Sequence, residues 1–318
     1  MRTAIVIALI TSASLAQQQS EPPATVGAVP EDKSIHSTLL LPKDTSKPMP
    51  VVLFISGSGP TDRDGNSPML PGKNNSLKML AEGLAMNGIA SLRYDKRGVG
   101  ASAKAMVAES DLRFETYIDD ATAFCEQLRA DMRFNAVVIA GHSEGSVIGM
   151  VAAKRCDASA FISIAGAGRP AGDILRAQLA GKLPPALATQ SDAILKDMEV
   201  GKTTEKPPVE LFAIYRPSVQ PYMISWLRYD PAKSIAALSV PVLIIQGTTD
   251  IQVSVDDAKR LAAASPKAKL LIVEGMNHVL KSVSSDKAKQ IASYSDPSLQ
   301  LTEDLLMNIV AFVRKVGK

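Results

Sequence analysis

The amino-acid sequence predicts an α/β protein with a mostly parallel β-sheet flanked by helices. Unbroken apolar runs alternate with segments whose apolar residues recur at helical spacing. Apolar strands without polar interruption are typical of a parallel sheet that helices cover on both faces. One long stretch without any strand pattern interrupts this alternation.

The predicted strands are residues 51–55, 89–94, 136–140, 160–165, 242–246 and 269–273. The predicted helices are residues 77–85, 118–132, 150–154, 256–264 and 305–313. The first strand ends in Ser-Gly-Ser-Gly, and the first helix stops at Asn87-Gly88, a typical helix end.

Residues 168–229 contain two helical patterns, the break Lys206-Pro207-Pro208 and the single tryptophan, Trp226. A structureless loop of this length is improbable inside a compact domain. The stretch is therefore predicted to form a helical cap, inserted before the strand at 242–246. We expect the cap to cover the carboxyl edge of the sheet, where ligands of open α/β sheets bind.

The amino terminus has the pattern of a secretory signal peptide. Met1-Arg2-Thr3 precedes a short apolar run, and Ser14 and Ala16 are the small residues expected before a cleavage site. The run is shorter than the ~20 apolar residues of a membrane anchor, and no other stretch is long enough to span a bilayer.

The sequence therefore predicts a signal peptide at 1–16, a flexible Gln- and Pro-rich leader at 17–33, and one domain at 34–318. The protein is expected to be exported, to the periplasm or the extracellular space.

Composition excludes several classes of protein. Lys+Arg 35 against Asp+Glu 32 gives a net charge of +3, which argues against a nucleic-acid partner. Two cysteines cannot build a disulfide scaffold or a four-cysteine zinc site, and three histidines leave little room for metal chemistry. We expect no metal and no organic cofactor; the oligomeric state stays open.

The strand at 136–140 leads into Gly-His-Ser-Glu-Gly, residues 141–145, and a helix follows. A G-x-S-x-G sequence between a strand and a helix is typical of a nucleophile elbow, a sharp turn that lifts the serine above the sheet. Residues larger than Gly141 and Gly145 would collide with neighbouring backbone. Ser143 is therefore the predicted nucleophile.

A serine nucleophile needs a base within roughly 2.6–3.2 Å. His36 precedes the first predicted strand and is expected at the surface, and the side chain of His142 is expected to point away from Ser143. His278 follows the strand at 269–273, at the carboxyl edge, and is the predicted base.

The base needs an acid to fix its tautomer. Asp250 follows the strand at 242–246 at the same edge, whereas its rivals Asp256 and Asp257 fall where helix-capping acids are expected. The order Ser143, Asp250, His278 is that of an α/β-hydrolase triad.

The oxyanion hole of such a site takes two backbone N–H groups. Glu144, directly after the nucleophile, is predicted to supply one. The loop after residues 51–55 is predicted to supply the other, with Ser58 favoured and Gly59 as the alternative.

Several motifs together resemble the α/β-hydrolase superfamily. They are the elbow, residues 57–65 (Gly-Ser-Gly-Pro-Thr-Asp-Arg-Asp-Gly), residues 93–102 (Arg-Tyr-Asp-Lys-Arg-Gly-Val-Gly-Ala-Ser), and residues 216–222 with Trp226 and Asp230-Pro231 in the cap region. Over residues 35–316 the chain is similar to the serine-aminopeptidase-like and dienelactone-hydrolase-like branch, and within it to bacterial carboxylesterases. The first loop opens with Ser56-Gly57 where this family usually has His-Gly.

Other polar residues are expected to be structural. Asp95 and Arg97 are predicted to fix their glycine-rich loop, and residues 62–65 lack the ligand spacing and distal glutamate of a calcium loop. The side chain of Glu144 is expected to support neighbouring loops. For Cys125 and Cys156 the choice between a disulfide and two buried free thiols is left open, with free thiols slightly favoured.

The leading functional hypothesis is a serine esterase that cleaves small-molecule carboxylic esters of short to medium acyl chain through an acyl-enzyme. The same triad could serve an aminopeptidase, amidase or thioesterase, and Glu205 and Glu210 in the cap do not decide between them. A hydrolase fold that only binds its ligand is the alternative from another class.

Overall fold

The computed structural model describes residues 35–317. Seven strands form one sheet in the order β1-β3-β2-β4-β5-β6-β7. The strands are β1 (Ser37–Leu40), β2 (Met49–Ile55), β3 (Ala90–Tyr94), β4 (Phe134–His142), β5 (Ala160–Ile164), β6 (Val242–Gly247) and β7 (Lys269–Val273). Every neighbouring pair is parallel except β1 and β3, so the predicted fold class is confirmed.

The α-helices of this region are α1 (Ser76–Met86), α2 (Phe114–Ala130), α3 (Glu144–Arg155), α4 (Ala171–Leu179), α5 (Pro185–Glu199), α6 (Phe212–Tyr215), α7 (Gln220–Leu227), α8 (Pro231–Ala236), α9 (Val255–Ala264), α10 (Lys287–Ser293) and α11 (Glu303–Val316). Short 3₁₀ helices occupy Gly100–Ala105, Glu109–Asp111 and Val209–Leu211. Neither the short antiparallel β1 nor α10 was expected from the sequence.

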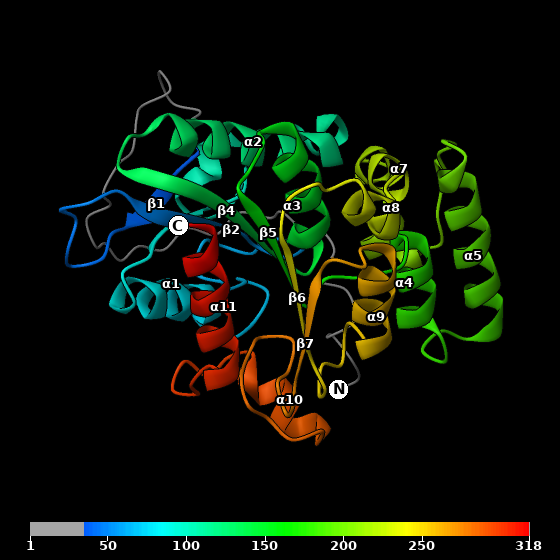
Figure 1. Cartoon of the computed structure of the whole chain (residues 1–318). Coiled ribbons are helices and arrows are strands. Elements are labelled where there is room, and N and C mark those ends of the chain that lie inside the picture. Colours follow the sequence, from blue (N-terminus) through cyan, green and yellow to red (C-terminus); the bar gives the residue numbers. More distant parts are fainter. Residues whose placement is uncertain (1–34, 318) are drawn as a thin grey trace.

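Helices cover both faces of the sheet, as the apolar strands require (Figure 1). On one face α1 and α11 pack over a core that includes Leu80 and Ile309. On the other face α2, α3 and α9 pack over a second core that includes Ile118 and Leu261. Apart from its edge strands β1 and β7, the sheet is thus a largely buried layer, and its strand ends are the places where the chain can present polar side chains.

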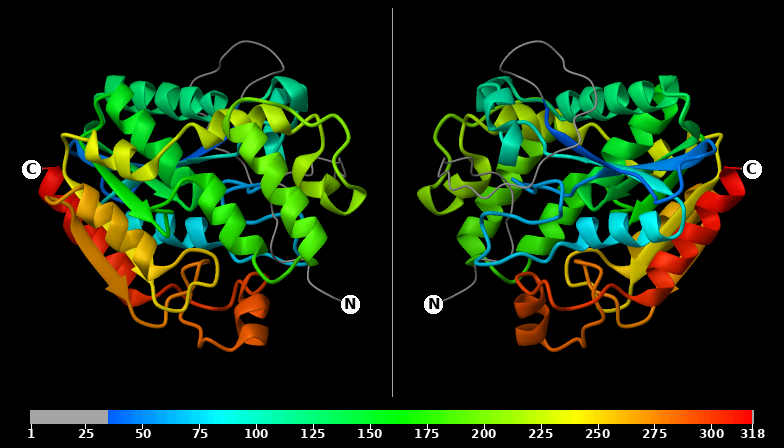
Figure 2. Two further views of the ribbon diagram at one scale, coloured as in Figure 1. Left: turned by 90° about the vertical axis from the view of Figure 1, so that its right-hand side faces the viewer. Right: turned by 90° about the vertical axis from the view of Figure 1, so that its left-hand side faces the viewer.

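Helices α4 to α8 lie between β5 and β6 in the sequence, and we call them the cap helices. They gather on one side of the molecule, visible as the green and yellow-green helices in Figure 2. Their buried residues, among them Leu175 and Tyr222, join the core on the α2 and α3 face. The cap helices run from Ala171 to Ala236, and α8 lies beyond the expected end at residue 229.

The choice that the sequence left open falls against the slightly favoured free thiols, because Cys125 and Cys156 form a disulfide. Cys125 lies in α2, and Cys156 follows the last residue of α3. The two helices pack side by side, which brings the Cα atoms to 6.2 Å, within the range that a disulfide spans. Helical periodicity places both residues on buried faces but does not show that the two faces meet.

Reducing this disulfide is expected to lower the free energy of unfolding by about 2–4 kcal/mol, because the bridge closes a loop in the unfolded chain. Urea unfolding of the purified protein with and without dithiothreitol measures the difference. The double variant Cys125→Ala/Cys156→Ala is the control, with low stability in both buffers. Identical urea midpoints for the wild-type protein would contradict the prediction.

Candidate active site

The residues predicted for catalysis follow three strands that end at the same edge of the sheet. Ser143 comes directly after β4, Asp250 lies in the loop after β6, and His278 lies in the loop after β7. Strands β4 to β7 are parallel and consecutive in the sheet, so these loops share the carboxyl edge.

Ser143 occupies a strained turn between β4 and α3. Its φ is 55° and its ψ is −120°, a conformation that costs a non-glycine residue about 1–3 kcal/mol. A Cβ at Gly141 would lie 2.1 Å from the carbonyl oxygen of Gly145, and one at Gly145 would lie 2.4 Å from that of Ile55. The expectation that only glycine fits at both positions is therefore confirmed.

Asp250 and His278 form a buried pair in which His278 Nδ1 lies 2.8 Å from Asp250 Oδ2. The side chain of Asp250 is fully buried, and that of His278 is 6% exposed. Gln246 also donates to Oδ2, at 2.9 Å, while the backbone N–H groups of Gln252 and Val253 donate to Oδ1, at 2.7 and 3.0 Å.

Burial by itself would raise the pKa of the Asp250 carboxyl. His278 and the backbone N–H groups of Val253 and Gln252 outweigh burial and lower that pKa below its ordinary value. Asp250 is therefore an anion that accepts a hydrogen bond from the imidazole of His278. This arrangement holds the imidazole proton on Nδ1 and leaves Nε2 free to accept a second proton.

His142 joins the loop of His278 to the nucleophile elbow. Its Nε2 lies 2.8 Å from the carbonyl oxygen of His278, and the two ring centroids are 4.9 Å apart. Burial, and next the neighbouring His278, lower the pKa of His142 to about 3, so the ring stays neutral and Nε2 donates. His36, in contrast, is exposed at the surface, as the sequence predicts.

The predicted oxyanion-hole residues Ser58 and Glu144 line one pocket together with Ser143. Gly57 brings the first loop against the elbow, since a Cβ there would lie only 3.2 Å from Cβ of Ser143. Thr61 closes the loop on itself, because its hydroxyl donates to the carbonyl of Ser58 at 2.8 Å. Gly59, the alternative donor, has a φ of 72° and is not among the lining residues of this pocket.

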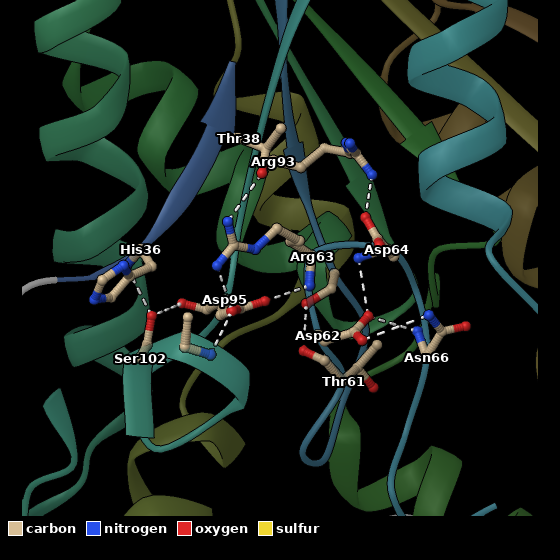
Figure 3. Close-up of polar contacts among 12 residues, drawn as sticks. His36, Thr38, Thr61, Asp62, Arg63, Asp64, Asn66, Arg93, Asp95 and Ser102 are labelled. Atoms are coloured by element: carbon tan, nitrogen blue, oxygen red, sulfur yellow. Dashed lines mark hydrogen bonds and ion pairs between the residues drawn. The ribbon is translucent and has the colours of Figure 1, made fainter. Parts of the chain in front are cut away.

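A polar network fixes the rest of the first loop (Figure 3). The carboxylate of Asp95 accepts hydrogen bonds from the backbone and the guanidinium of Arg63, at 2.8 and 2.7 Å. Asp64 pairs with Arg93, and Asp62 accepts from the backbone N–H of Asn66. Asp62 and its neighbours thus hold the loop together. Within residues 35–317, no set of three or more His, Cys, Asp or Glu side chains is suited to holding a metal.

The loop after β3 is structural in the way the sequence predicts. Asp95 also accepts from the backbone N–H of Ala101 at 2.9 Å. Arg97 makes a bidentate pair with Asp120 of α2, at 2.7 and 2.6 Å.

The pocket beside Ser143 lies between the elbow and the cap helices. Its apolar lining comes largely from Val147 of α3 and from cap residues, Ile174, Leu175, Trp226 and Tyr229 among them. Arg169 and Gln178 add polar groups. The cavity measures about 80 Å³, room for about five to eight water-sized groups.

Residues 35–317 contain no helix with the length and hydropathy to cross a bilayer.

Two residues near the site were not predicted to have roles there. Lys96 is 2% exposed and lies against the first loop, yet in the sequence it is one charge among the neighbours Asp95 and Arg97. Gln246 is fully buried and orients Asp250. The one sequence signal that could have identified Gln246 is its place as a glutamine at the end of an otherwise apolar strand.

Comparison with known proteins places the chain among hydrolases. The family model for serine aminopeptidase, S33, matches residues 73–282. Esterase EstD of Thermotoga maritima is 30% identical over 246 residues, 76% of this chain. The chain spans 57% of the length of that curated relative.

Solved structures share the fold at low identity. Est1E from Butyrivibrio proteoclasticus, with ferulic acid bound, has a TM-score of 0.55 and 17% identity, over 88% of this chain and 93% of that one. A thermophilic esterase from Thermogutta terrifontis, with malate bound, has a TM-score of 0.52 and 16% identity, over 89% and 95%. At such identities the likeness concerns the α/β-hydrolase fold alone.

Proposed function

The chain belongs to the serine aminopeptidase (S33) family of α/β-hydrolases, and from this premise we propose that it is a serine esterase. The observation that carries the proposal is the buried Asp250–His278 pair, tied through His142 to the elbow that presents Ser143. The proposed substrates are carboxylic esters of small molecules, with short to medium acyl chains that suit the cavity of about 80 Å³.

The proposed reaction proceeds through an acyl-enzyme. Ser143 Oγ attacks the ester carbonyl as His278 Nε2 takes its proton, and the oxyanion accepts from the backbone N–H groups of Glu144 and Ser58. The alcohol leaves with the proton from His278. Water, deprotonated in turn by His278, then attacks the acyl carbonyl carbon. The intermediate expels Ser143 Oγ, which takes the proton back from His278, and the acid is released. Asp250 holds the imidazole and stabilises its charged form in both halves.

The pocket lining favours an ester over a peptide amino terminus. An aminopeptidase needs an acidic group to bind the substrate's ammonium, and the acidic residue that lines this pocket is Glu144. Its carboxylate is committed elsewhere, because Tyr222 hydrogen-bonds to it and Lys96 lies 3.9 Å away. Glu205 and Glu210 do not line the pocket.

We expect p-nitrophenyl esters to be turned over faster than aminoacyl p-nitroanilides, with an optimum at short to medium chains. Initial rates on a chain-length series beside the anilides measure this. A fluorophosphonate probe should label the wild-type protein at Ser143. Anilide turnover above ester turnover would identify a peptidase instead, and an unlabelled folded protein would identify a ligand-binding protein without hydrolase chemistry.

Export remains part of the proposal. The signal peptide at 1–16 and the leader at 17–33 lie outside the described residues. The Cys125–Cys156 disulfide supports an oxidising compartment, where such bonds persist. Amino-terminal sequencing of protein from the culture medium and the periplasm should give Gln17 as the first residue; an intact Met1 in the cytoplasmic fraction alone would oppose export.

A further inference from the structure

Lys96 is a buried cation whose contacts join the two segments that would form the oxyanion hole. Its Nζ donates to the carbonyl oxygen of Gly57 at 2.5 Å and lies 3.9 Å from Glu144 Oε1. It also lies over the ring of Tyr117, 5.3 Å from the centroid. Removing an ammonium from water is costly, so these contacts must offset a penalty that a methionine in the same space would not carry.

The contact with Gly57 acts on the peptide group that carries one predicted donor. In a trans peptide the C=O and N–H point in opposite directions, and no peptide bond within residues 35–317 is cis. Lys96 binds the Gly57 carbonyl, so the N–H of Ser58 faces away from Lys96, and Ser58 lines the pocket of Ser143. A charged donor on the carbonyl also polarises the peptide and strengthens its N–H as a donor.

The contact with Glu144 acts on the residue that carries the other predicted donor. Glu144 begins α3 directly after Ser143, and its side chain points into the same buried cluster. Its Oε1 is buried without a hydrogen bond, with Lys96 as the nearby cation. Burial raises the pKa of Glu144 and lowers that of Lys96. The charge of each side chain is therefore stabilised by the other, and removing one partner would leave the other charge buried and unpaired.

We propose that Lys96 is a positioning residue. It holds the Gly57–Ser58 peptide and the first turn of α3 at the relative positions in which the N–H groups of Ser58 and Glu144 form one oxyanion hole. The proposal rests on the esterase function proposed above. Lys96 does not contact the substrate. It acts through the orientation and polarity of the Ser58 N–H and through the side chain of Glu144.

Thionoesters provide a readout specific to the oxyanion hole, because sulfur accepts hydrogen bonds weakly. Lys96→Met is expected to lower kcat for oxygen esters by about 10- to 100-fold, less than the 10²–10³-fold that loss of a whole donor costs, with little change in KM. Turnover of the matching thionoester should fall much less. The ratio of oxoester to thionoester turnover should therefore drop about tenfold or more.

Lys281→Met is the matched control. Lys281 is also fully buried, and its Nζ donates to the carbonyl of Leu299 at 2.6 Å, outside the Ser143 pocket. It should change the urea midpoint without changing the oxoester to thionoester ratio. If Lys96→Met does not fold, Lys96→Gln keeps a neutral donor near Gly57 and should give a smaller drop in the same ratio.

The outcomes separate the two proposals. A wild-type protein that neither reacts with fluorophosphonate nor turns over esters would overturn the esterase function. A wild-type protein that is active, with folded Lys96 variants that keep the ratio unchanged, would overturn the role of Lys96 alone. This holds even if those variants are slower, because an equal loss for both ester types would mean a structural role.

Discussion

Ser143→Ala is expected to lower kcat for ester hydrolysis by at least about 10⁴-fold, because the variant has no oxygen to form the acyl-enzyme. The free energy of unfolding should stay within about 0.5 kcal/mol of the wild-type value, because serine and alanine at this position bear the same positive φ. In addition, the Ser143 hydroxyl makes no hydrogen bond within the described part of the chain. Initial rates on a p-nitrophenyl ester and urea unfolding measure the two quantities.

Ser146→Ala is the control for this change. Ser146 lies one turn along α3, and its buried hydroxyl is 2.8 Å from that of Ser163. Its loss should cost about 1–3 kcal/mol of stability, because the Ser163 hydroxyl is left unpaired, and should preserve fluorophosphonate labelling. If Ser143→Ala kept more than about one per cent of the wild-type rate, Ser143 would not be the nucleophile.

Asp250→Asn is expected to lower kcat by about 10⁴-fold with the fold intact. The backbone N–H groups of Gln252 and Val253 both point at Oδ1, so they will select the amide oxygen there. The amide NH₂ then faces His278 Nδ1, which must accept a hydrogen bond. This tautomer carries its proton on Nε2 and cannot take one from Ser143.

Asp256→Asn is the matched control, since Asp256 is a rival acid from the same stretch of sequence with a side chain 79% exposed. Its variant should retain wild-type kcat in the same p-nitrophenyl ester assay. Equal losses in the two variants would remove Asp250 from the triad. Asp257 is already engaged in another contact, a bidentate pair with Arg169 at 2.9 Å to each oxygen.

Most strands could be predicted because the inner ones, such as β2, β5 and β6, are buried on both faces and are therefore mostly apolar. The short β1 could not be predicted, because its four residues, Ser37–Leu40, are too few to show a recognisable hydrophobic pattern. They pair antiparallel at the edge of the sheet. Helix α10 escaped for a similar reason: its sequence, Lys-Ala-Lys-Gln-Ile-Ala-Ser, has few apolar residues to repeat.

The positions of Ser143, Asp250 and His278 could be predicted because each lies in the turn or loop that follows a recognisable strand. The disulfide and Lys96 could not. Whether Cys125 meets Cys156 depends on how α2 and α3 are rotated against each other, which no local pattern records. Lys96 looks like a solvated loop residue, because burial of its charge depends on Tyr117 and Gly57, which are distant in sequence.

The place where the cap helices enter the fold has an evolutionary consequence. The chain leaves the sheet after Ile164 and returns at Val242, in two strands that are already hydrogen-bonded neighbours. Insertions, deletions or wholesale replacement between those points need not break a strand pair, and Ser143, Asp250 and His278 all lie outside them. Selection can therefore remodel the cap helices while Ser143, Asp250 and His278 are inherited unchanged.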